Sequence, residues 1–351
     1  MAARSWLTLV CMMHVCACAS DDEAPKPAKG EQASAADSDE KKKPEYDLPP
    51  IRGVTEMGLT AVWGSAADDV WAVGSDGAVV HWDGKMLEVV ASTTTRSLHA
   101  IGGTGPDDIW ATGDEGTTLH WDGRRFEFVQ RWESETYLGI NAIAPDNVWI
   151  VGVVPVDRVG IVRHYDGNTW RASEVPGSYS LWEVWSSAAD DVWFVGTNPT
   201  QGGVVYRGNG TDFDRIEFDG KPLRGIWGDS PDDVWVQPYD SSPQHWDGSS
   251  FHSEETEGDE ERGMLGTWGA APDDVWAVGL HGKIKHWDGE VWTVMKSLLD
   301  QPLWAVWGSS KDDVWAVGGA GAILRWNGDH WRIFATSALE VNGAPALSAQ
   351  P

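Results

Sequence analysis

The sequence predicts an all-β protein made of seven small antiparallel sheets, and three observations support this. A motif of the form Asp-(Asp/Asn)-(Val/Ile)-Trp recurs every 39 to 44 residues, starting at Asp68, Asp107, Asp146, Asp190, Asp232, Asp273 and Asp312. Each repeat contains four short apolar runs separated by turn-forming residues, and none has room for a long helix. The 351 residues include 24 tryptophans, many at fixed positions of the repeat. This pattern predicts a seven-bladed β-propeller of four-stranded blades.

The first repeat shows the expected strands most clearly. We expect strand a at Leu59–Trp63, strand b at Val70–Gly74, strand c at Ala78–Trp82 and strand d at Met86–Val90. A Ser/Pro-Asp-Asp signal lies between a and b, and Asp-Gly or Asn-Gly lies between c and d, as in tight hairpins. Each repeat can form one complete blade, or Ile51–Met57 can pair across the seam with the last blade. An open array would leave its end faces uncovered, so a closed ring is favoured.

Tryptophan at fixed positions explains how the blades could be held together. We expect one set to fill the wedge between neighbouring sheets, because a buried aromatic ring removes about 150–250 Å² from water. That is worth roughly 4–6 kcal/mol gross at about 25 cal/mol/Å². These structural residues are Trp71, Trp110, Trp149, Trp193, Trp235, Trp276 and Trp315.

The amino terminus reads as a targeting segment. Residues 1–17 are expected to form a signal peptide, and Val15-Cys16-Ala17-Cys18 resembles the lipobox of bacterial lipoproteins. That resemblance implies cleavage before Cys18, a lipidated, acylated Cys18, and a membrane anchor. The alternative is an ordinary secretion signal cut near Ala19. Residues 18–50 are too polar to form a core and are expected to be a disordered linker, followed by the propeller at 51–337 and a disordered tail at 338–351.

A longer motif supports the same location. The series Trp-Gly-Ser-x-x-Asp-Asp-Val-Trp-Ala-Val-Gly, followed by His-Trp-Asp-Gly, resembles the Trp-rich repeats of exported lipoproteins of myxobacteria and their relatives. The resemblance covers residues 59–336 and implies a propeller-like fold and an exported, membrane-anchored protein, with the outer membrane expected. A partial resemblance extends to WD repeats and to the Asp box of sialidase-type propellers.

Composition and periodicity argue against several functions. The net charge of −28 disfavours nucleic acid as a partner. The Asp pairs recur at one turn position and are expected to cap turns. One strand c position carries His81, His120, His164, His245 and His286, which we expect to be structural. We therefore expect no catalytic residue, no metal and no cofactor, and the protein is predicted not to be an enzyme.

Departures from the repeat indicate where a ligand could bind. Insertions fall in the b–c loops at Val153–Gly160, Thr197–Gly203 and Gln237–Pro243, and the d–a links vary at Trp132–Tyr137 and in the acidic run Glu254–Glu261. In an antiparallel blade both loop classes lie at one end, so one face should be uniform and the other variable. The acidic run is expected to be a solvated loop. The candidate binding loops contribute Trp132, Tyr137, Arg158, Asn198, Gln201, Tyr239 and Asp240.

The second residue of strand a also differs between repeats. It is expected at Thr60, His99, Gly139, Trp182, Arg224, Leu265 and Trp304. Because strand a is innermost in a propeller, these residues should surround the central channel, and His99, Trp182, Arg224 and Trp304 form the candidate binding rim. The alternative is that they merely fill the channel.

Together these features predict a lipid-anchored, non-enzymatic binding or scaffold propeller of the bacterial cell envelope. We expect a monomer whose variable face engages an envelope protein, with the lipid anchor as its only membrane contact. A carbohydrate-binding propeller is the first alternative, since aromatic faces also suit sugars. An envelope hydrolase or lyase with an acidic site is the second.

Overall fold

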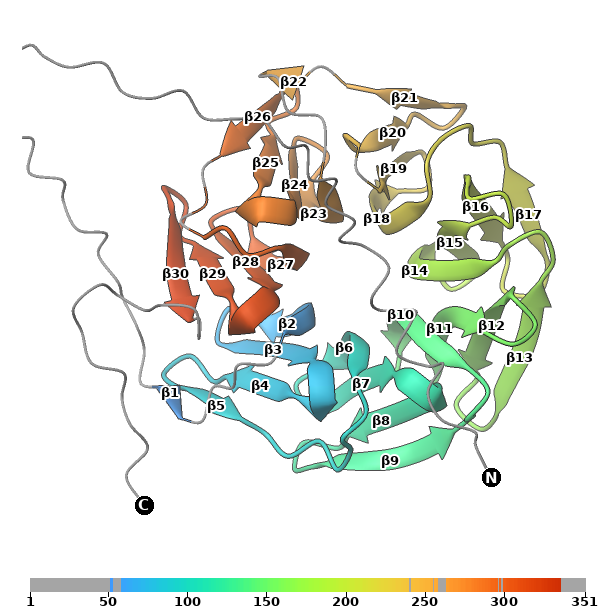
Figure 1. Ribbon diagram of the computed structural model, residues 1–351, viewed down its shortest axis with the longest axis horizontal. Coiled ribbons are helices and arrows are strands. Elements are labelled where there is room, and N and C mark those ends of the chain that lie inside the picture. The colour runs from blue at the N-terminus through green and yellow to red at the C-terminus, as the bar shows by residue number, and fades with distance from the viewer. Residues whose placement is uncertain are drawn as a thin grey trace, which may run out of the picture. The chain divides into compact units, whose positions relative to one another are not determined.

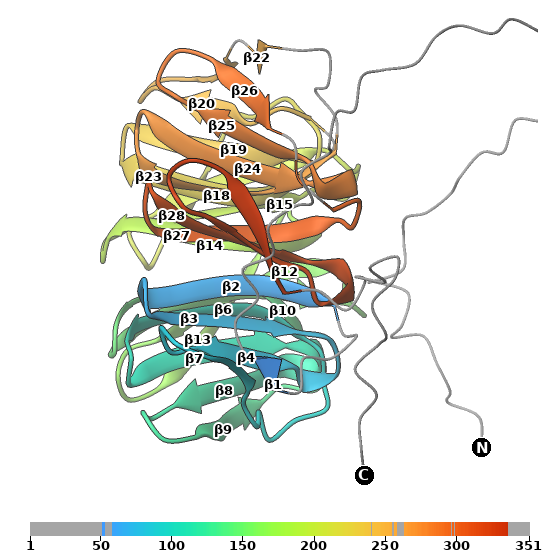
Figure 2. The ribbon, with the colours of Figure 1, turned by 90° about the vertical axis from the view of Figure 1, so that its left-hand side faces the viewer.

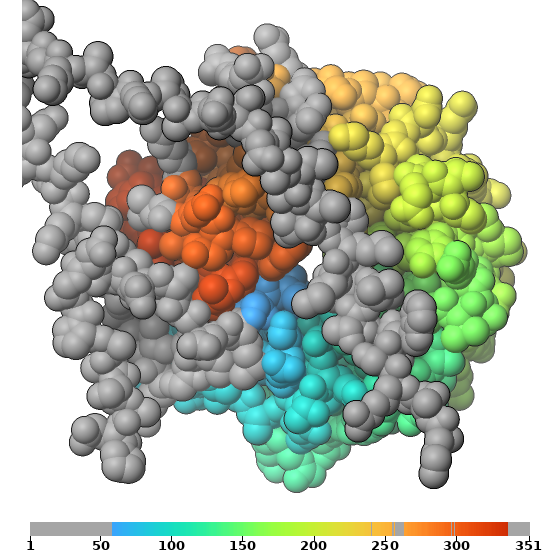
Figure 3. Space-filling model, in the orientation of Figure 1, coloured from blue at the N-terminus to red at the C-terminus, as the bar shows by residue number. Residues whose placement is uncertain are grey.

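The computed structural model describes residues 51–52 and 58–335, apart from 240, 255, 258–262, 296 and 298. These residues form seven antiparallel blades around a centre (Figure 1), which confirms the predicted seven-bladed β-propeller. In the side view of Figure 2, the blades stack as separate sheets. The space-filling view of Figure 3 shows neighbouring blades packed side by side around the ring. Within the described ranges, no helix is both long and apolar enough to cross a membrane.

Strands a to d follow one another along the chain in every blade. In blades 1 to 4 they are β2 (Leu59–Ala66), β3 (Asp69–Gly74), β4 (Val79–Trp82) and β5 (Leu87–Val89); β6 (Leu98–Gly105), β7 (Asp108–Gly113), β8 (Thr117–Trp121) and β9 (Phe126–Arg131); β10 (Thr136–Ala144), β11 (Asn147–Val154), β12 (Val159–Tyr165) and β13 (Trp170–Val175); β14 (Ser180–Ala188), β15 (Asp191–Thr197), β16 (Gly203–Gly208) and β17 (Phe213–Ile216).

Blades 5 to 7 continue this order. Their strands are β18 (Leu223–Ser230), β19 (Asp233–Pro238), β20 (Gln244–Trp246) and β21 (Phe251–Ser253); β23 (Met264–Ala271), β24 (Asp274–Gly279), β25 (Ile284–Trp287) and β26 (Trp292–Met295); β27 (Leu303–Ser310), β28 (Asp313–Gly318), β29 (Ile323–Trp326) and β30 (Trp331–Ala335). Short 3-10 turns η2 (Ser75–Gly77), η3 (Asp114–Gly116), η4 (Leu280–Gly282) and η5 (Gly319–Gly321) connect strands b and c in four blades.

Each repeat forms one complete blade, so the proposed strand exchange between the termini is wrong for the described residues. The final blade supplies all four of its own strands, from β27 to β30. The short strand β1 (Ile51–Arg52) instead pairs in parallel with β5 at the outer edge of blade 1. Residues 53–57 of the same predicted segment lie outside the described part. A second added strand, β22 (Thr256–Glu257), pairs in parallel with β26 at the outer edge of blade 6.

One tryptophan of the repeat motif fills each space between neighbouring blades, including the space where the last blade meets the first. Every tryptophan of the repeat motif is at most 4% exposed, and each packs against an aromatic ring of the next blade. The centroids lie 4.9 to 6.2 Å apart in the pairs Trp71–Trp121, Trp110–Tyr165, Trp149–Phe213, Trp193–Trp246, Trp235–Trp287, Trp276–Trp326 and Trp315–Trp82. The last pair joins blade 7 to blade 1, and one hydrophobic cluster spans that seam.

A second set of tryptophans explains the glycine that follows Trp in strand a. Trp268 of blade 6 reaches the position of Gly308 in blade 7, where an added Cβ would lie 2.6 Å from its ring. Trp307 reaches Gly64 across the seam in the same way, also at 2.6 Å. Five such Trp–Gly contacts join six of the inner strands, and in each one the tryptophan occupies space that a glycine of the next blade leaves empty.

The turns on one face are uniform. Strands a and b are joined by two residues in every blade, and strands c and d by four. In each c–d turn an Asp or Asn side chain accepts backbone hydrogen bonds; in the first, Asp83 Oδ1 accepts from Lys85 N at 2.8 Å and from Met86 N at 2.7 Å. Gly84 and its equivalents take positive φ, between 84° and 93°, whereas the preceding Asp or Asn does not. The turn thus depends on side-chain capping and on one glycine.

Candidate functional site

The innermost strands each carry a β-bulge at their second or third residue, on the side of the variable loops. The pairing with strand b skips Thr60, His99, Leu138, Trp182, Arg224, Leu265 and Trp304. A bulge leaves one residue unpaired and redirects its side chain. Six of these seven residues are the ones singled out in the sequence. In blade 3 the bulged residue is Leu138, because Tyr137 takes the place of the apolar first residue; Gly139 pairs with Val151 instead.

The side chains of the candidate rim fall into three arrangements. The Arg224 guanidinium lies over Trp182, with Cζ 3.4 Å from the centroid of that ring and 5.4 Å from the centroid of Tyr239. Trp304 is 42% exposed, unusually high for so large an apolar side chain. His99 Nε2 lies 2.7 Å from Asp114 Oδ1 in the b–c turn of its own blade. The inner strands thus present a cation–π stack that joins β14 to β18 and an open indole on β27.

The residue after the bulge adds a carboxylate that the sequence analysis did not single out. The other six blades place Ala or Gly there, where neighbouring inner strands approach closely. Gly139, for example, leaves room for the backbone of Glu183, whose Cα would lie 2.8 Å from an added Cβ. Blade 4 places Glu183 at this position, paired with Val195. Burial raises the pKa of Glu183 to about 8, partly offset by a hydrogen bond from the backbone N–H of Val184. A neutral carboxylic acid therefore stands beside Trp182 at neutral pH.

Glu183→Gln is expected to remove a pH-dependent loss of stability. The folded-state pKa of Glu183 is raised above its ordinary value of 4.5, so the penalty is absent below pH 4.5 and grows as the pH rises towards 8. The side chain keeps some solvent contact, which reduces the effect. We therefore expect the difference in unfolding free energy between variant and wild type to be about 2 kcal/mol larger at pH 8.5 than at pH 5, in favour of the variant. Urea unfolding at the two pH values measures this. Equal differences at both would contradict the assignment, and Glu290→Gln in an exposed turn serves as the control.

Two candidate loop residues pack onto blade 3, Tyr137 in its interior and Trp132 half-buried against its core. Tyr137 is 0% exposed, so its side chain is not part of the surface. Its hydroxyl donates to Glu135 Oε2 at 2.6 Å, and Arg163 holds the same carboxylate through Nε at 2.8 Å and Nη2 at 2.6 Å. The Arg163 guanidinium also lies 3.7 Å from the ring centroid of Trp132. Burial, with the hydrogen bond to Glu135, holds the pKa of Tyr137 far above its ordinary range.

The other candidate loop residues divide between the surface and local structure. Arg158 and Gln201 are exposed and have positive φ of 55° and 68°. Asn198 caps its own loop, since its Oδ1 accepts from Thr200 N at 2.9 Å and from Gly202 N at 2.8 Å. Tyr239 is half-buried beside Arg224. Asp240, Cys18 and most of the acidic run Glu254–Glu261 lie outside the described residues.

A cleft on the variable face was not anticipated. It has a volume of about 640 Å³ and lies between the d–a link of blade 1 and the outer strands of blade 2; its lining includes Ser92–Arg96, Thr117, Phe128 and Arg131. Arg96 and Arg131 both reach Glu115 on η3, with Arg96 Nη1 2.8 Å from Glu115 Oε1. The run of Ser and Thr between Ala91 and Arg96 was the available signal, because it interrupts the repeat without any large apolar residue.

The periodic Asp and His residues form an internal network. In blade 1, Asp69 Oδ1 accepts from Trp71 Nε1 at 2.8 Å and lies 2.7 Å from His81 Nε2. The His81 ring stacks on Trp71 with centroids 3.9 Å apart. Blades 4 and 7 replace the His by Arg207 and Arg325, each with Nε 2.6 Å from the corresponding Asp. These strand c residues therefore serve the packing of the blade. The second residue of each Asp-(Asp/Asn) pair binds them, as Asn147 does for His164 in blade 3, so it does more than cap a turn.

The fold and the two unlike faces define a β-propeller with a candidate binding face. The chain is similar to the solved structure of YCF48 from Cyanidioschyzon merolae, with 16% identity over 78% of this chain and 96% of that chain and a TM-score of 0.62. It is also similar to YCF48 bound to D1 peptide, with 16% identity, coverage of 78% and 94%, and a TM-score of 0.60.

A third similar structure comes from another group of propellers. The WD40 beta propeller domain of Doa1 shows 12% identity over 81% of this chain and 96% of that chain, with a TM-score of 0.63. At these identities the likeness establishes the fold alone. No protein-family model matches the chain, and a search of curated proteins finds no match.

Proposed function

We propose that this chain is a non-enzymatic scaffold that binds a segment of a protein partner on its variable face. The observation that carries the proposal is the contrast between periodic and individual residues. Packing positions repeat from blade to blade, whereas the bulged residues of the inner strands differ, and they include the Arg224–Trp182 stack and the exposed Trp304. Exposed aromatic and guanidinium groups are the side chains that most often anchor protein interfaces.

A propeller of similar fold gives this proposal a precedent. The structure of YCF48 bound to D1 peptide is a propeller carrying a peptide. In the present chain, the Arg224 guanidinium lies over Trp182, with Cζ 3.4 Å from the ring centroid, and its positive charge favours a carboxylate of the partner. Trp304 offers an apolar contact on β27. The cleft at Ser92–Arg96 adds hydroxyl groups on the same face.

Crosslinking in intact cells tests the proposal. Wild-type chain with a carboxy-terminal tag is expected to retain one dominant crosslinked protein, and the double variant Arg224→Ala/Trp304→Ala to lose at least about nine-tenths of it, as expected when interface anchors are removed. Arg124→Ala, in an exposed c–d turn of the uniform face, is the matched control and should retain the partner. Loss with Arg124→Ala and retention with the double variant would place the interface on the opposite face.

The proposal includes a membrane anchor and an envelope location. The lipobox-like sequence Val15-Cys16-Ala17-Cys18 supports lipidation of Cys18, with residues 19–50 as the spacer that separates the propeller from the membrane. Cys18→Ser is expected to move the protein from the membrane fraction to the soluble fraction. Unchanged fractionation would remove the anchor from the proposal without affecting the binding face.

A carbohydrate-binding propeller is the second candidate, favoured by the open indole of Trp304. Aromatic faces stack on sugar rings, and Trp304 is the most accessible tryptophan on the inner strands of the described part. A glycan array with the purified chain separates the two candidates. Binding that disappears in Trp304→Ala would favour the lectin, and an empty array would leave the protein-binding scaffold.

A further inference from the structure

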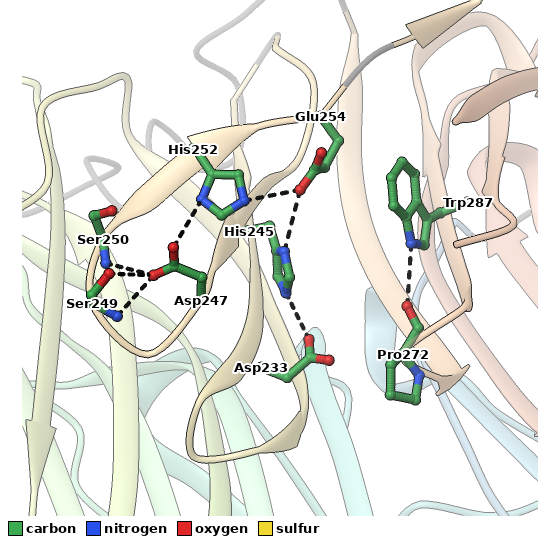
Figure 4. Close-up of polar contacts among 9 residues, drawn as sticks. All are labelled: Asp233, His245, Asp247, Ser249, Ser250, His252, Glu254, Pro272 and Trp287. Carbon is green, nitrogen blue, oxygen red and sulfur yellow. Dashed lines mark hydrogen bonds and ion pairs between the residues drawn. The ribbon is translucent and has the colours of Figure 1, made fainter. Parts of the chain in front are cut away.

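Blade 5 brings two imidazoles and one carboxylate together near its outer edge. His245 lies on β20, His252 on the paired strand β21, and Glu254 directly after β21; Figure 4 shows the three side chains pointing toward one another. Glu254 Oε1 lies 2.9 Å from His252 Nε2 and 3.3 Å from His245 Nδ1. One ligand atom from each residue falls within 4.8 Å of the others. The three groups thus surround a single point.

This cluster departs from the repeat. In every blade the His or Arg of strand c pairs with a residue of strand d. In the six blades other than blade 5 these paired residues are Glu88, Glu127, Arg171, Asp214, Thr293 and Arg332. Blade 5 alone places a second histidine there, as His252 opposite His245. Glu254 follows two residues later, which returns its side chain to the same face of the strand. The arrangement is specific to one blade and does not serve the general packing of the ring.

Neighbouring carboxylates set the orientation of both imidazoles. His245 Nε2 lies 2.8 Å from Asp233 Oδ1, which favours the proton on Nε2 and leaves the Nδ1 lone pair facing Glu254. Asp247 Oδ2 lies 4.0 Å from His252 Nδ1, beyond hydrogen-bond distance, but its charge favours the proton on Nδ1 and so leaves Nε2 facing Glu254. Two nitrogen lone pairs and a carboxylate oxygen then converge. A cation among these three atoms would have three ligand atoms at once.

We propose that His245 Nδ1, His252 Nε2 and Glu254 Oε1 bind a first-row divalent cation, with Zn²⁺ as the best fit. Two imidazoles and a carboxylate are a ligand set that Zn²⁺ accepts, and metal–ligand bonds of about 2.0–2.1 Å in tetrahedral geometry place ligand atoms about 3.3 Å apart. The side chains are 21%, 40% and 25% exposed, so water can supply the fourth ligand. Asp233 then acts as the carboxylate that orients a ligating histidine.

The place of the site in the fold indicates what the cation does. Glu254 precedes β22, which crosses to blade 6 and pairs with β26 through Thr256–Trp292 and Glu257–Thr293. A cation bound by Glu254 fixes the residue that precedes this crossing to blade 5. The pairing of β22 with β26 fixes the residues that follow it to blade 6. The metal therefore ties the outer edges of two neighbouring blades, and the acidic run that begins at Glu254 contains a ligand.

Equilibrium dialysis of the full-length chain against Zn²⁺, after removal of metals with a chelator, tests the proposal at pH 7.5. We expect one Zn²⁺ per chain. His252→Gln and Glu254→Gln should each weaken binding by more than about 100-fold, and Asp233→Asn by about 10- to 100-fold. His330→Gln is the matched control, because His330 is 51% exposed and also lies beside an acid, with Nδ1 3.0 Å from Asp329.

Cobalt gives a second readout that does not depend on affinity alone. Co²⁺ in place of Zn²⁺ should produce the visible absorption of a tetrahedral site, and His252→Gln should abolish it while the far-ultraviolet circular dichroism stays unchanged. Unaltered Zn²⁺ affinity in both His252→Gln and Glu254→Gln would overturn the proposal. Absence of stoichiometric Zn²⁺ binding to the wild-type chain at roughly 100-fold excess metal would overturn it as well, and would assign the cluster to protonated histidines paired with acids.

Discussion

Trp276→Ala is expected to lower the free energy of unfolding by about 3–5 kcal/mol, the usual cost of truncating a fully buried aromatic residue. Trp276 is 1% exposed. Its ring lies 5.1 Å from Trp326 and 5.3 Å from Trp331 of the next blade, between centroids, and it stacks on His286 at 4.2 Å. Removing it empties the wedge between blades 6 and 7. Urea unfolding followed by circular dichroism measures the loss.

The matched control is Trp304→Ala, a tryptophan of the neighbouring inner strand that is 42% exposed. Its expected cost is about half that of Trp276→Ala, since nearly half of its side chain is already in water in the folded state. If the two substitutions cost the same, the motif tryptophans do not carry the contact between blades and the explanation of ring closure fails.

Arg163→Ala is expected to cost about 3–5 kcal/mol, because it leaves the Glu135 carboxylate buried without its cation. The Arg163 and Glu135 side chains are each 9% exposed, and Nη2 lies 2.6 Å from Oε1. The Tyr137 hydroxyl donates to the same carboxylate and is then left to stabilise it alone. Urea unfolding at neutral pH measures the loss.

Two comparisons separate a buried pair from an ordinary ion pair. Arg125→Ala breaks the exposed pair of Arg125 and Glu127, whose side chains are 73% and 51% exposed, and should leave the free energy of unfolding nearly unchanged. The double variant Arg163→Met/Glu135→Leu should recover most of the stability, because no buried charge remains. An Arg163→Ala cost no greater than that of Arg125→Ala would contradict this interpretation of blade 3.

Most of the fold could be predicted because its determinants are local and repeated. The Asp-Gly turn at Asp83 fixes one hairpin, and the Trp after each acidic pair marks the buried face of strand b. The interlocking of Trp268 with Gly308 was present as a Trp-Gly dipeptide in the sequence, although its partner lies in the next blade. Ring closure followed because the seventh repeat carries the same wedge residue, Trp315, as the first six.

The sequence could predict residues of the candidate site only where a residue differs from its equivalents in the other repeats. The bulge at Leu138 was placed one residue late, because Leu138 resembles the apolar first residues Leu59 and Leu98 while Tyr137 occupies that place. The interior position of Tyr137 depends on Arg163, a residue whose contact with Glu135 spans 28 positions of sequence. The cluster of His245, His252 and Glu254 needs the cross-strand register, which one sequence does not give.

Site-specific photocrosslinking from the two faces in intact cells tests the central claim most directly. A photoreactive residue in place of Gln201, an exposed residue of the b–c loop of blade 4, samples the variable face while leaving Trp304 and Arg224 in place, and one in place of Arg124 samples the uniform face. We expect a defined protein adduct from position 201 and none from position 124. A defined adduct from position 124 alone would contradict it, because the chain would then meet its partner through the face on which all seven blades are alike.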